Sequence, residues 1–145
     1  MDDTNSISVD SVAPAEAGPA GLLLGRDLIF TSKVTGTARA LGRRVLVAGS
    51  PDLAASMIEQ WRPRVVFVDL AAGDLVTPEA LVAYRSLAGA GTPFVAFGSH
   101  VDTAALAAAR AAGCDRVMAR SEFSRTLPDL VRQYLPDNDG PSTAG

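Results

Sequence analysis

Asp69 is the residue of this sequence whose position most favours chemistry. It follows Val65-Val66-Phe67-Val68, a charge-free run of β-branched and aromatic residues. Such a run predicts a strand that is buried on both faces, as in the middle of a parallel sheet. An aspartate at the end of that strand lies at the carboxyl edge of the sheet, where open α/β folds bind their ligands. A partly buried carboxylate there needs a partner, and Lys33, Arg120 or backbone N–H groups are the candidates.

Other polar residues are expected at the same edge, because they follow other predicted strands. We expect the pocket around Asp69 to contain Thr31, Ser32, Lys33, Gly98, Ser99 and Arg120. Lys33 is the only lysine, and it either neutralises Asp69 as a built-in cation or stays solvated at a helix end. The hydroxyl-rich segment 31–37 either caps a helix or binds a phosphate or carboxylate with free helix N–H groups. It does not match the GxxxxGK[ST] phosphate loop.

Alternating strands and helices must position these residues. The predicted strands are 27–30, 44–48, 65–68, 94–97 and 116–118, with 22–24 as a short apolar lead-in. The helices begin at Thr31 or Ser32, at Pro51 after the cap Ser50, at Pro78 after Thr77, after the cap Asp102, and at Pro128. Leu53, Met57 and Trp61 are expected to form the buried stripe of the second helix. This alternation predicts a flavodoxin-like α/β fold, with a five-stranded parallel sheet in the order 2-1-3-4-5 and helices on both faces.

Composition restricts the possible functions. Of the 145 residues, 1–20 and 136–145 are polar, acidic and rich in Pro and Gly, and we predict that they are disordered tails around one domain at 21–135. That domain has ten acids and thirteen scattered bases, a balance too mild to indicate nucleic acid. One cysteine and one histidine exclude a disulfide within the chain and a zinc cluster. With no apolar run long enough for a membrane and no secretory leader, a cytoplasmic protein is expected.

Two segments resemble the receiver domain of bacterial two-component response regulators. Residues 62–70, Arg-Pro-Arg-Val-Val-Phe-Val-Asp-Leu, resemble the segment that ends in the family's phosphate-accepting aspartate. Residues 111–117, Ala-Ala-Gly-Cys-Asp-Arg-Val, resemble the segment that precedes the family's lysine. The resemblance covers about 26–135, implies the receiver fold, and makes Asp69 the equivalent of the phosphoacceptor.

The residues that the family uses for phosphorylation are otherwise replaced. A receiver holds Mg²⁺ with an acidic pair after its first strand, because phosphoryl transfer to a carboxylate requires charge neutralisation. With the first strand at 27–30, the matching positions are Thr31 and Ser32. The family's hydroxyl residue falls on Gly98, its lysine on Arg120 and its proline on Ser121. We therefore expect a degenerate receiver, or pseudo-receiver, that has no catalytic residues, metal or cofactor.

The resemblance also implies how such a domain acts. We expect contact with another signalling protein, or a homodimer, through the face formed by the fourth helix, fifth strand and fifth helix. That face is expected to carry Arg110, Arg116, Arg120, Arg125 and Arg132. Two alternatives remain at this point: a sensor that binds a small anionic metabolite at 31–37, and an atypical regulator that is phosphorylated on Asp69.

Overall fold

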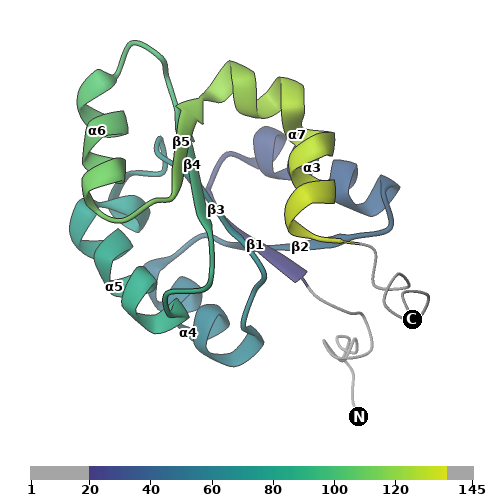
Figure 1. Ribbon diagram of the computed structural model, residues 1–145, viewed down its shortest axis with the longest axis horizontal. Coiled ribbons are helices and arrows are strands. Elements are labelled where there is room, and N and C mark those ends of the chain that lie inside the picture. The colour runs from purple at the N-terminus through teal and green to yellow at the C-terminus, as the bar shows by residue number, and fades with distance from the viewer. Residues whose placement is uncertain (1–19, 137–145) are drawn as a thin grey trace.

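The computed structural model describes residues 20–136 as a five-stranded parallel sheet in the order β2-β1-β3-β4-β5 (Figure 1). The strands are β1 (Ala20–Leu24), β2 (Arg44–Ala48), β3 (Val66–Asp69), β4 (Phe94–Gly98) and β5 (Arg116–Ala119). The helices are α3 (Leu28–Ala40), α4 (Pro51–Trp61), α5 (Pro78–Ala88), α6 (Thr103–Ala111) and α7 (Arg120–Tyr134), with a short 3₁₀ helix η1 (Gly73–Val76). The predicted fold class and strand order are confirmed.

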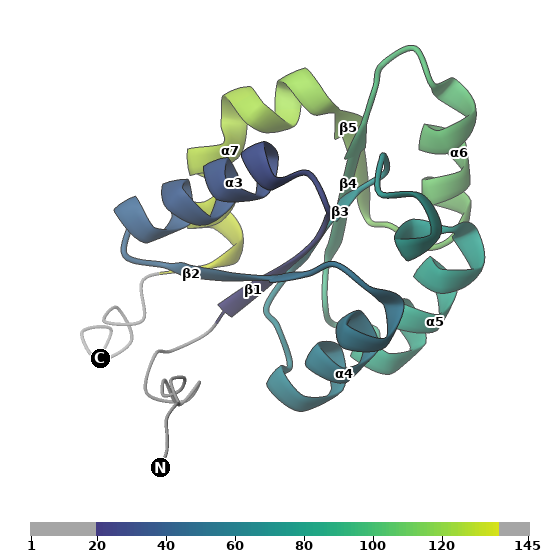
Figure 2. The same ribbon diagram turned by 180° about the vertical axis from the view of Figure 1, so that it is seen from behind.

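Helices cover both faces of the sheet. Figure 2 shows α3 and α7 together on one side and α4, α5 and α6 on the other. Each layer encloses its own apolar cluster, one built around Leu24, Val68 and Ile58 and the other around Leu23 and Phe67. Neighbouring residues of β1 and β3 point into opposite clusters, as the alternation of a strand requires. The central strand β3 is buried along its whole length, as its charge-free sequence predicted.

Helix caps explain where most helices begin. The side chains of Ser50, Thr77 and Asp102 accept hydrogen bonds from the backbone N–H of Leu53, Ala80 and Ala105, at 3.1–3.2 Å. Pro51 and Pro78 occupy the first turn of their helices, where a missing N–H costs nothing. These three helix starts are confirmed.

The buried stripe of α4 differs from the prediction. Ala54 and Ile58 face the core, whereas Leu53 is 46% exposed and both Met57 and Trp61 are half-buried. The larger apolar residues therefore lie beside the buried stripe, and Met57 still packs against the core from there.

The first strand lies earlier in the chain than the sequence predicted. Residues 20–24 form β1, all of them buried, so Ala20 belongs to the sheet and not to the predicted tail. Asp27 is the N-cap of α3, and its Oδ1 accepts hydrogen bonds from the N–H groups of Ile29 and Phe30 at 3.0 and 3.1 Å. The run Leu28–Phe30, predicted as a strand, is therefore the first turn of a helix.

The last helix is also longer than predicted. It begins at Arg120, directly after β5, and Pro128 lies in its interior instead of at its start. Four buried residues, Phe123, Leu127, Leu130 and Val131, hold α7 against the sheet. This burial outweighs the hydrogen bond that a proline cannot donate to the preceding turn.

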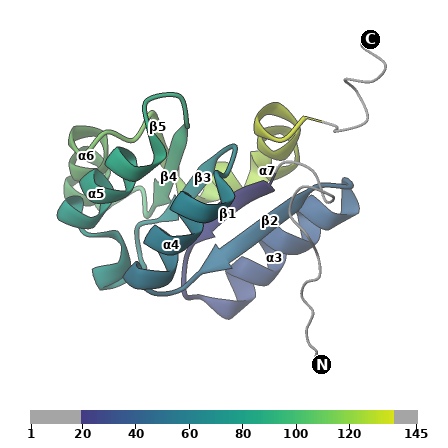
Figure 3. The same ribbon diagram turned by 90° about the horizontal axis from the view of Figure 1, so that it is seen from below.

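The two edges of the parallel sheet differ in what they contain. The carboxyl ends of the strands meet at the edge that contains Asp69. The described chain begins with β1 and ends after α7 at the amino edge (Figure 1), where Arg43 Nε donates to the carbonyl of Leu135 at 2.7 Å. Seen from below, β2 is the outermost strand, between α3 and α4 (Figure 3). Apart from Ala20 and Pro136, the predicted tails lie outside the described residues.

Candidate functional site

Asp69 ends β3 at the carboxyl edge, and its side chain is only 4% exposed. Its Oδ1 accepts a hydrogen bond from the N–H of Ala71 at 2.9 Å, and its backbone carbonyl accepts one from Ala72 at 3.1 Å. These two bonds fix the turn that leaves the strand. A buried carboxylate in this turn still needs a cation or further donors.

Arg120 supplies that cation. Its Nη2 lies 2.6 Å from Asp69 Oδ1, and its Nη1 lies 3.5 Å from Oδ2. Arg120 can reach Asp69 because it directly follows β5, and only β4 separates β5 from β3. The guanidinium thus contacts both carboxylate oxygens, a geometry that a lysine cannot reproduce.

Aromatic rings hold Arg120 in this orientation. Its Cζ lies 5.0 Å from the ring centroid of Phe30 and 5.3 Å from that of Phe97, distances typical of cation–π contact. Phe97 stacks in turn on Phe123, with centroids 4.0 Å apart and planes 16° apart. The ion pair of Arg120 and Asp69 therefore lies on a packed layer of phenylalanines from α3, β4 and α7.

Arg26 places a second guanidinium at this edge. It follows β1, and it donates from Nε to the carbonyl of Gly49 at 2.9 Å and from Nη1 to the carbonyl of Ala72 at 3.2 Å. Nη1 also lies 2.5 Å from Asp74 Oδ1, and this ion pair lowers the pKa of the Asp74 carboxyl. Arg26 thus joins the loops that follow β1, β2 and β3.

The residues that directly follow β1 are therefore Gly25 and Arg26, not the predicted Thr31 and Ser32. Gly25 is buried, and a Cβ built on it lies 3.7 Å from Asp69 Cβ, so this position directly adjoins the carboxylate. The only acid of this loop, Asp27, is committed to capping α3. Arg26 was not predicted as a site residue. The run Leu22-Leu23-Leu24, followed by Gly25 and the cap residue Asp27, could have indicated a strand that ends just before it.

The site does not fit a magnesium ion. Magnesium requires oxygen ligands, and here a guanidinium follows β1 while Asp69 is already paired. Among residues 20–136, no three His, Cys, Asp or Glu residues are grouped closely enough to hold a metal ion.

Of the six predicted pocket residues, Gly98, Ser99 and Arg120 line one cavity. The cavity has a volume of about 250 Å³ and lies between the segments that follow β3 and β4, with Leu70, Ala71, Asp102 and Ala105 as its other walls. Ser99 Oγ accepts a hydrogen bond from the N–H of Val101 at 3.4 Å.

Thr31, Ser32 and Lys33 lie elsewhere, within α3. The hydroxyl of Thr31 donates to the carbonyl of Leu28 at 3.2 Å, and Ser32 is exposed. Lys33 is exposed and its Nζ is hydrogen-bonded to Ser124 Oγ of α7, so of the two alternatives for Lys33 the pairing with Asp69 is not the one that the structure has. Thr31, Val34 and Ala38 face the sheet, and Lys33 therefore lies on the side of α3 that packs on α7.

Solved receiver domains share this fold. A CheY-like receiver domain from Methanospirillum hungatei is 16% identical, over 88% of this chain and 99% of that one, with a TM-score of 0.69. A response regulator from Thermotoga maritima is 17% identical, over 83% of this chain and 99% of that one, with a TM-score of 0.67.

A third similar structure holds a metal ion. The receiver domain of a sensor histidine kinase from Pseudomonas aeruginosa is 16% identical, over 83% of this chain and 99% of that one, with a TM-score of 0.67, and has magnesium coordinated in its active-site cleft. No protein-family model matches the sequence, and no curated protein matches it significantly. At these identities the likeness is one of fold.

Proposed function

We propose that this chain, which has the fold of response regulator receiver domains, is a pseudo-receiver that signals through protein contacts without magnesium-dependent phosphorylation of Asp69. One observation supports this proposal most directly: Arg120 contacts both oxygens of the Asp69 carboxylate. A carboxylate that attacks a phosphoryl donor needs a free oxygen and a metal ion to neutralise the transferred group. Here both carboxylate oxygens of Asp69 are engaged by Arg120. Arg26 follows β1, where a magnesium site would need an acidic ligand.

The phosphorylatable alternative is tested directly with a small phosphodonor. We expect acetyl phosphate with magnesium to leave the intact mass of the protein unchanged, under conditions that modify an ordinary receiver. Asp69→Asn serves as the matched control for phosphorylation elsewhere in the chain. A stoichiometric phosphoryl adduct that is lost in Asp69→Asn would overturn the proposal.

The sensor alternative has less support. The segment 31–37 lies inside α3, and its Thr31 and Thr35 hydroxyls donate to carbonyls of that helix. The first free N–H groups of the helix are bonded to Asp27. Two of the four hydroxyls of this segment, and the first N–H groups of the helix, are therefore already engaged.

The predicted contact face consists of α6, β5 and α7. Arg110, Arg116, Arg125 and Arg132 are exposed on these elements, whereas Arg120 turns inward to Asp69. We propose that this face meets another signalling protein or a second copy of the chain. Light scattering on the wild type and on Arg125→Glu tests the second case, because a dimer through this face should dissociate in the variant. No helix among residues 20–136 is long and apolar enough to cross a membrane.

A further inference from the structure

The outer face of α3 carries two large apolar residues that residues 20–136 leave open to solvent. Leu28 and Ile29, in the first turn of the helix, are 80% and 85% exposed. The opposite side of α3, with Thr31, Val34 and Ala38, faces the sheet. Single exposed apolar residues are common, but two adjacent aliphatic side chains at one helix end form a patch. A patch of this kind is typical of a surface that meets another protein.

Gly36 lies on the same face of α3, seven residues and about two turns after Ile29. A glycine inside a helix lowers stability relative to alanine. Gly36 does not have a positive φ, and a Cβ built on it meets no atom within 4 Å. Neither the backbone nor the packing of the described residues therefore requires glycine here. For a group that approaches α3 from outside, the missing Cβ leaves a hollow on the helix surface.

Charges of opposite sign lie at the two ends of α3. Asp27 caps the first turn through Oδ1 and does not use Oδ2 for the cap. Arg39 lies in the last turn and is exposed. Twelve residues, or about 18 Å along a helix, separate Asp27 from Arg39, so the two cannot pair within one copy. Lys33, between them, donates a hydrogen bond to Ser124 on the side of α7.

We propose that α3 packs antiparallel against α3 of a second copy of this chain. Ile29 of each copy enters the hollow at Gly36 of the other, and Asp27 of each copy pairs with Arg39 of the other. One alignment satisfies both contacts, because residues 27 and 39 are centred on position 33 and residues 29 and 36 are centred between positions 32 and 33. Such reciprocal contacts are what a two-fold dimer requires, and antiparallel helix dipoles also favour it. The inference does not depend on the function proposed for Asp69, and it leaves the face of α6, β5 and α7 to another signalling protein.

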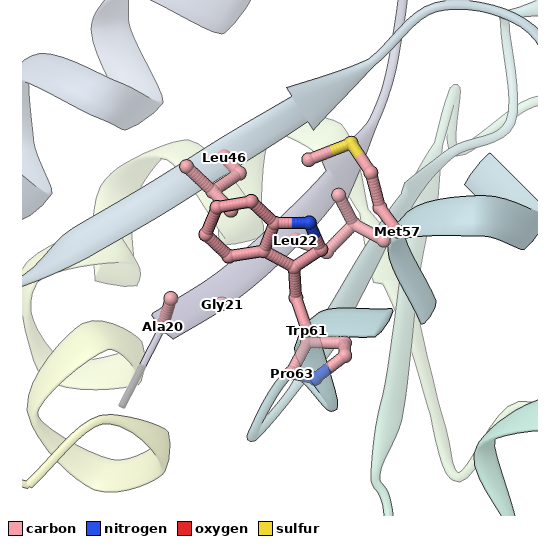
Figure 4. A pocket seen from close by; sticks show the side chains of 7 residues that line it. All are labelled: Ala20, Gly21, Leu22, Leu46, Met57, Trp61 and Pro63. Atoms are coloured by element: carbon pink, nitrogen blue, oxygen red, sulfur yellow. The ribbon is translucent and has the colours of Figure 1, made fainter. Parts of the chain in front are cut away.

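Other hollows of the described surface are less suited to receive Ile29. Figure 4 shows a crevice in which the indole of Trp61 lies beside Leu46. Its volume is about 10 Å³, too small for an isoleucine side chain. The groove between α5 and α6 has a volume of about 250 Å³, but Glu79 in its wall has the same charge as Asp27 beside the apolar patch. A contact there would also be head-to-tail and would build growing chains, whereas the contact between two α3 helices closes at two copies.

Sedimentation velocity on the full chain at increasing concentration measures the association. One pair of short helices buries less area than a standard interface, so we expect a dimer with a dissociation constant of about 10–100 μM. Gly36→Leu fills the hollow and should abolish the dimer. Ala83→Leu adds similar bulk at an exposed position of α5 and should leave the dimer unchanged. A wild type that stays monomeric up to about 1 mM, or that grows beyond two copies, would overturn the proposal.

Gly36→Ala distinguishes an interface glycine from one that is merely exposed. Alanine is the better helix former and has open space here, so the unfolding equilibrium constant of the monomer should fall about fivefold. The same methyl group occupies the hollow, so the dissociation constant of the dimer should rise roughly tenfold. A variant that is more stable and associates as the wild type does would show that Gly36 is not part of the contact.

A double-mutant cycle tests the charges of the proposed dimer. Asp27→Asn keeps a capping side chain and removes its charge, and Arg39→Gln removes the opposite charge. Because these residues lie about 18 Å apart within one helix, a coupling in the dissociation constant has to act between copies, and we expect about fivefold. Arg125→Glu, on the face of α6, β5 and α7, should leave the dimer intact. A dimer that is lost in Arg125→Glu and kept in Gly36→Leu would overturn the inference.

Discussion

At the scale of single residues, the ion pair of Asp69 and Arg120 makes the clearest prediction. Arg120→Ala leaves the buried carboxylate of Asp69 with one backbone donor, so the free energy of unfolding should fall by about 2 kcal/mol. This loss is smaller than the ~3–5 kcal/mol of fully buried pairs, because the Arg120 side chain is 31% exposed. Asp69→Asn with Arg120→Ala should cost less than the sum of the single changes. Urea unfolding measures all three. Arg125→Ala, at an exposed position of the same helix, is the control and should change little.

Cys114 gives a second prediction at this scale. Burial, with a smaller contribution from Asp115, raises the pKa of its thiol from 9.0 to about 11. Because the thiolate is the reactive form, the folded protein at about pH 8 should react with a thiol reagent roughly a hundredfold more slowly than the denatured chain. The rate should rise with a midpoint near pH 11 when folded and near pH 9 when unfolded. Equal rates in the two states would show that the thiol is freely accessible.

The end of the first strand was the part of the site that the sequence analysis misplaced. Asp69 ends β3 and Arg120 directly follows β5. The predicted strand order placed both residues at the carboxyl edge of the sheet, where the structure has them. Lys33 was expected at the same edge because the first strand was predicted to end at Phe30, only three residues before it. Once the helix begins at Leu28, the rotation per residue places Lys33 against α7.

At the scale of elements, the boundary between β1 and α3 can be tested through its cap. Asp27→Ala removes a side chain that accepts from two backbone N–H groups, so it should cost about 1 kcal/mol of unfolding free energy. Asp27→Ser keeps a capping oxygen and should lose much less. Circular dichroism with urea measures both variants. Equal stability of the wild type and Asp27→Ala would contradict a helix start at Leu28.

This boundary also shows the limit of pattern reading. Leu28-Ile29-Phe30 is an apolar run of the kind that predicts a strand, yet Leu28 and Ile29 are 80% and 85% exposed. The hydrophobic pattern alone assigns such residues to the core. In the structure the buried run 20–24 forms the strand, and the cap at Asp27 starts the helix directly after it. Elements with both a cap and a proline at their first turn, α4 and α5, were placed correctly because two independent signals agreed.

The phenylalanine layer gives a second prediction at the scale of elements. Phe123 is fully buried and contacts Phe97, Phe30 and Phe67, which belong to three different elements. Phe123→Ala should therefore cost about 3–5 kcal/mol and release α7 and Arg120 together. Denaturant unfolding measures the loss, with Glu122→Ala as the exposed neighbour. A cost like that of Glu122→Ala would show that the stack does not anchor the helix.

At the scale of the whole molecule, the fold should tolerate the reconstruction of a magnesium site. Gly25→Asp and Arg26→Asp place two carboxylates directly after β1, and a Cβ at Gly25 meets its neighbours at ordinary distances of 3.4 Å or more. Combined with Arg120→Lys, which frees one side of Asp69, the variant should bind magnesium saturably, while the wild type should not. Amide NMR shifts during a magnesium titration distinguish the two. Saturable binding by the wild type near Asp69 would contradict the pseudo-receiver proposal.

The two outer strands of the sheet bear on how copies of this protein behave at high concentration. An open sheet has two lines of unpaired backbone groups, and such lines can template the addition of further strands into aggregates. Here β2 and β5 are only five and four residues long, and each begins with an arginine, Arg44 and Arg116. Short length and a positive charge at the point of entry oppose the docking of a like-charged second strand. Association between copies by addition of strands at β2 or β5 is therefore disfavoured.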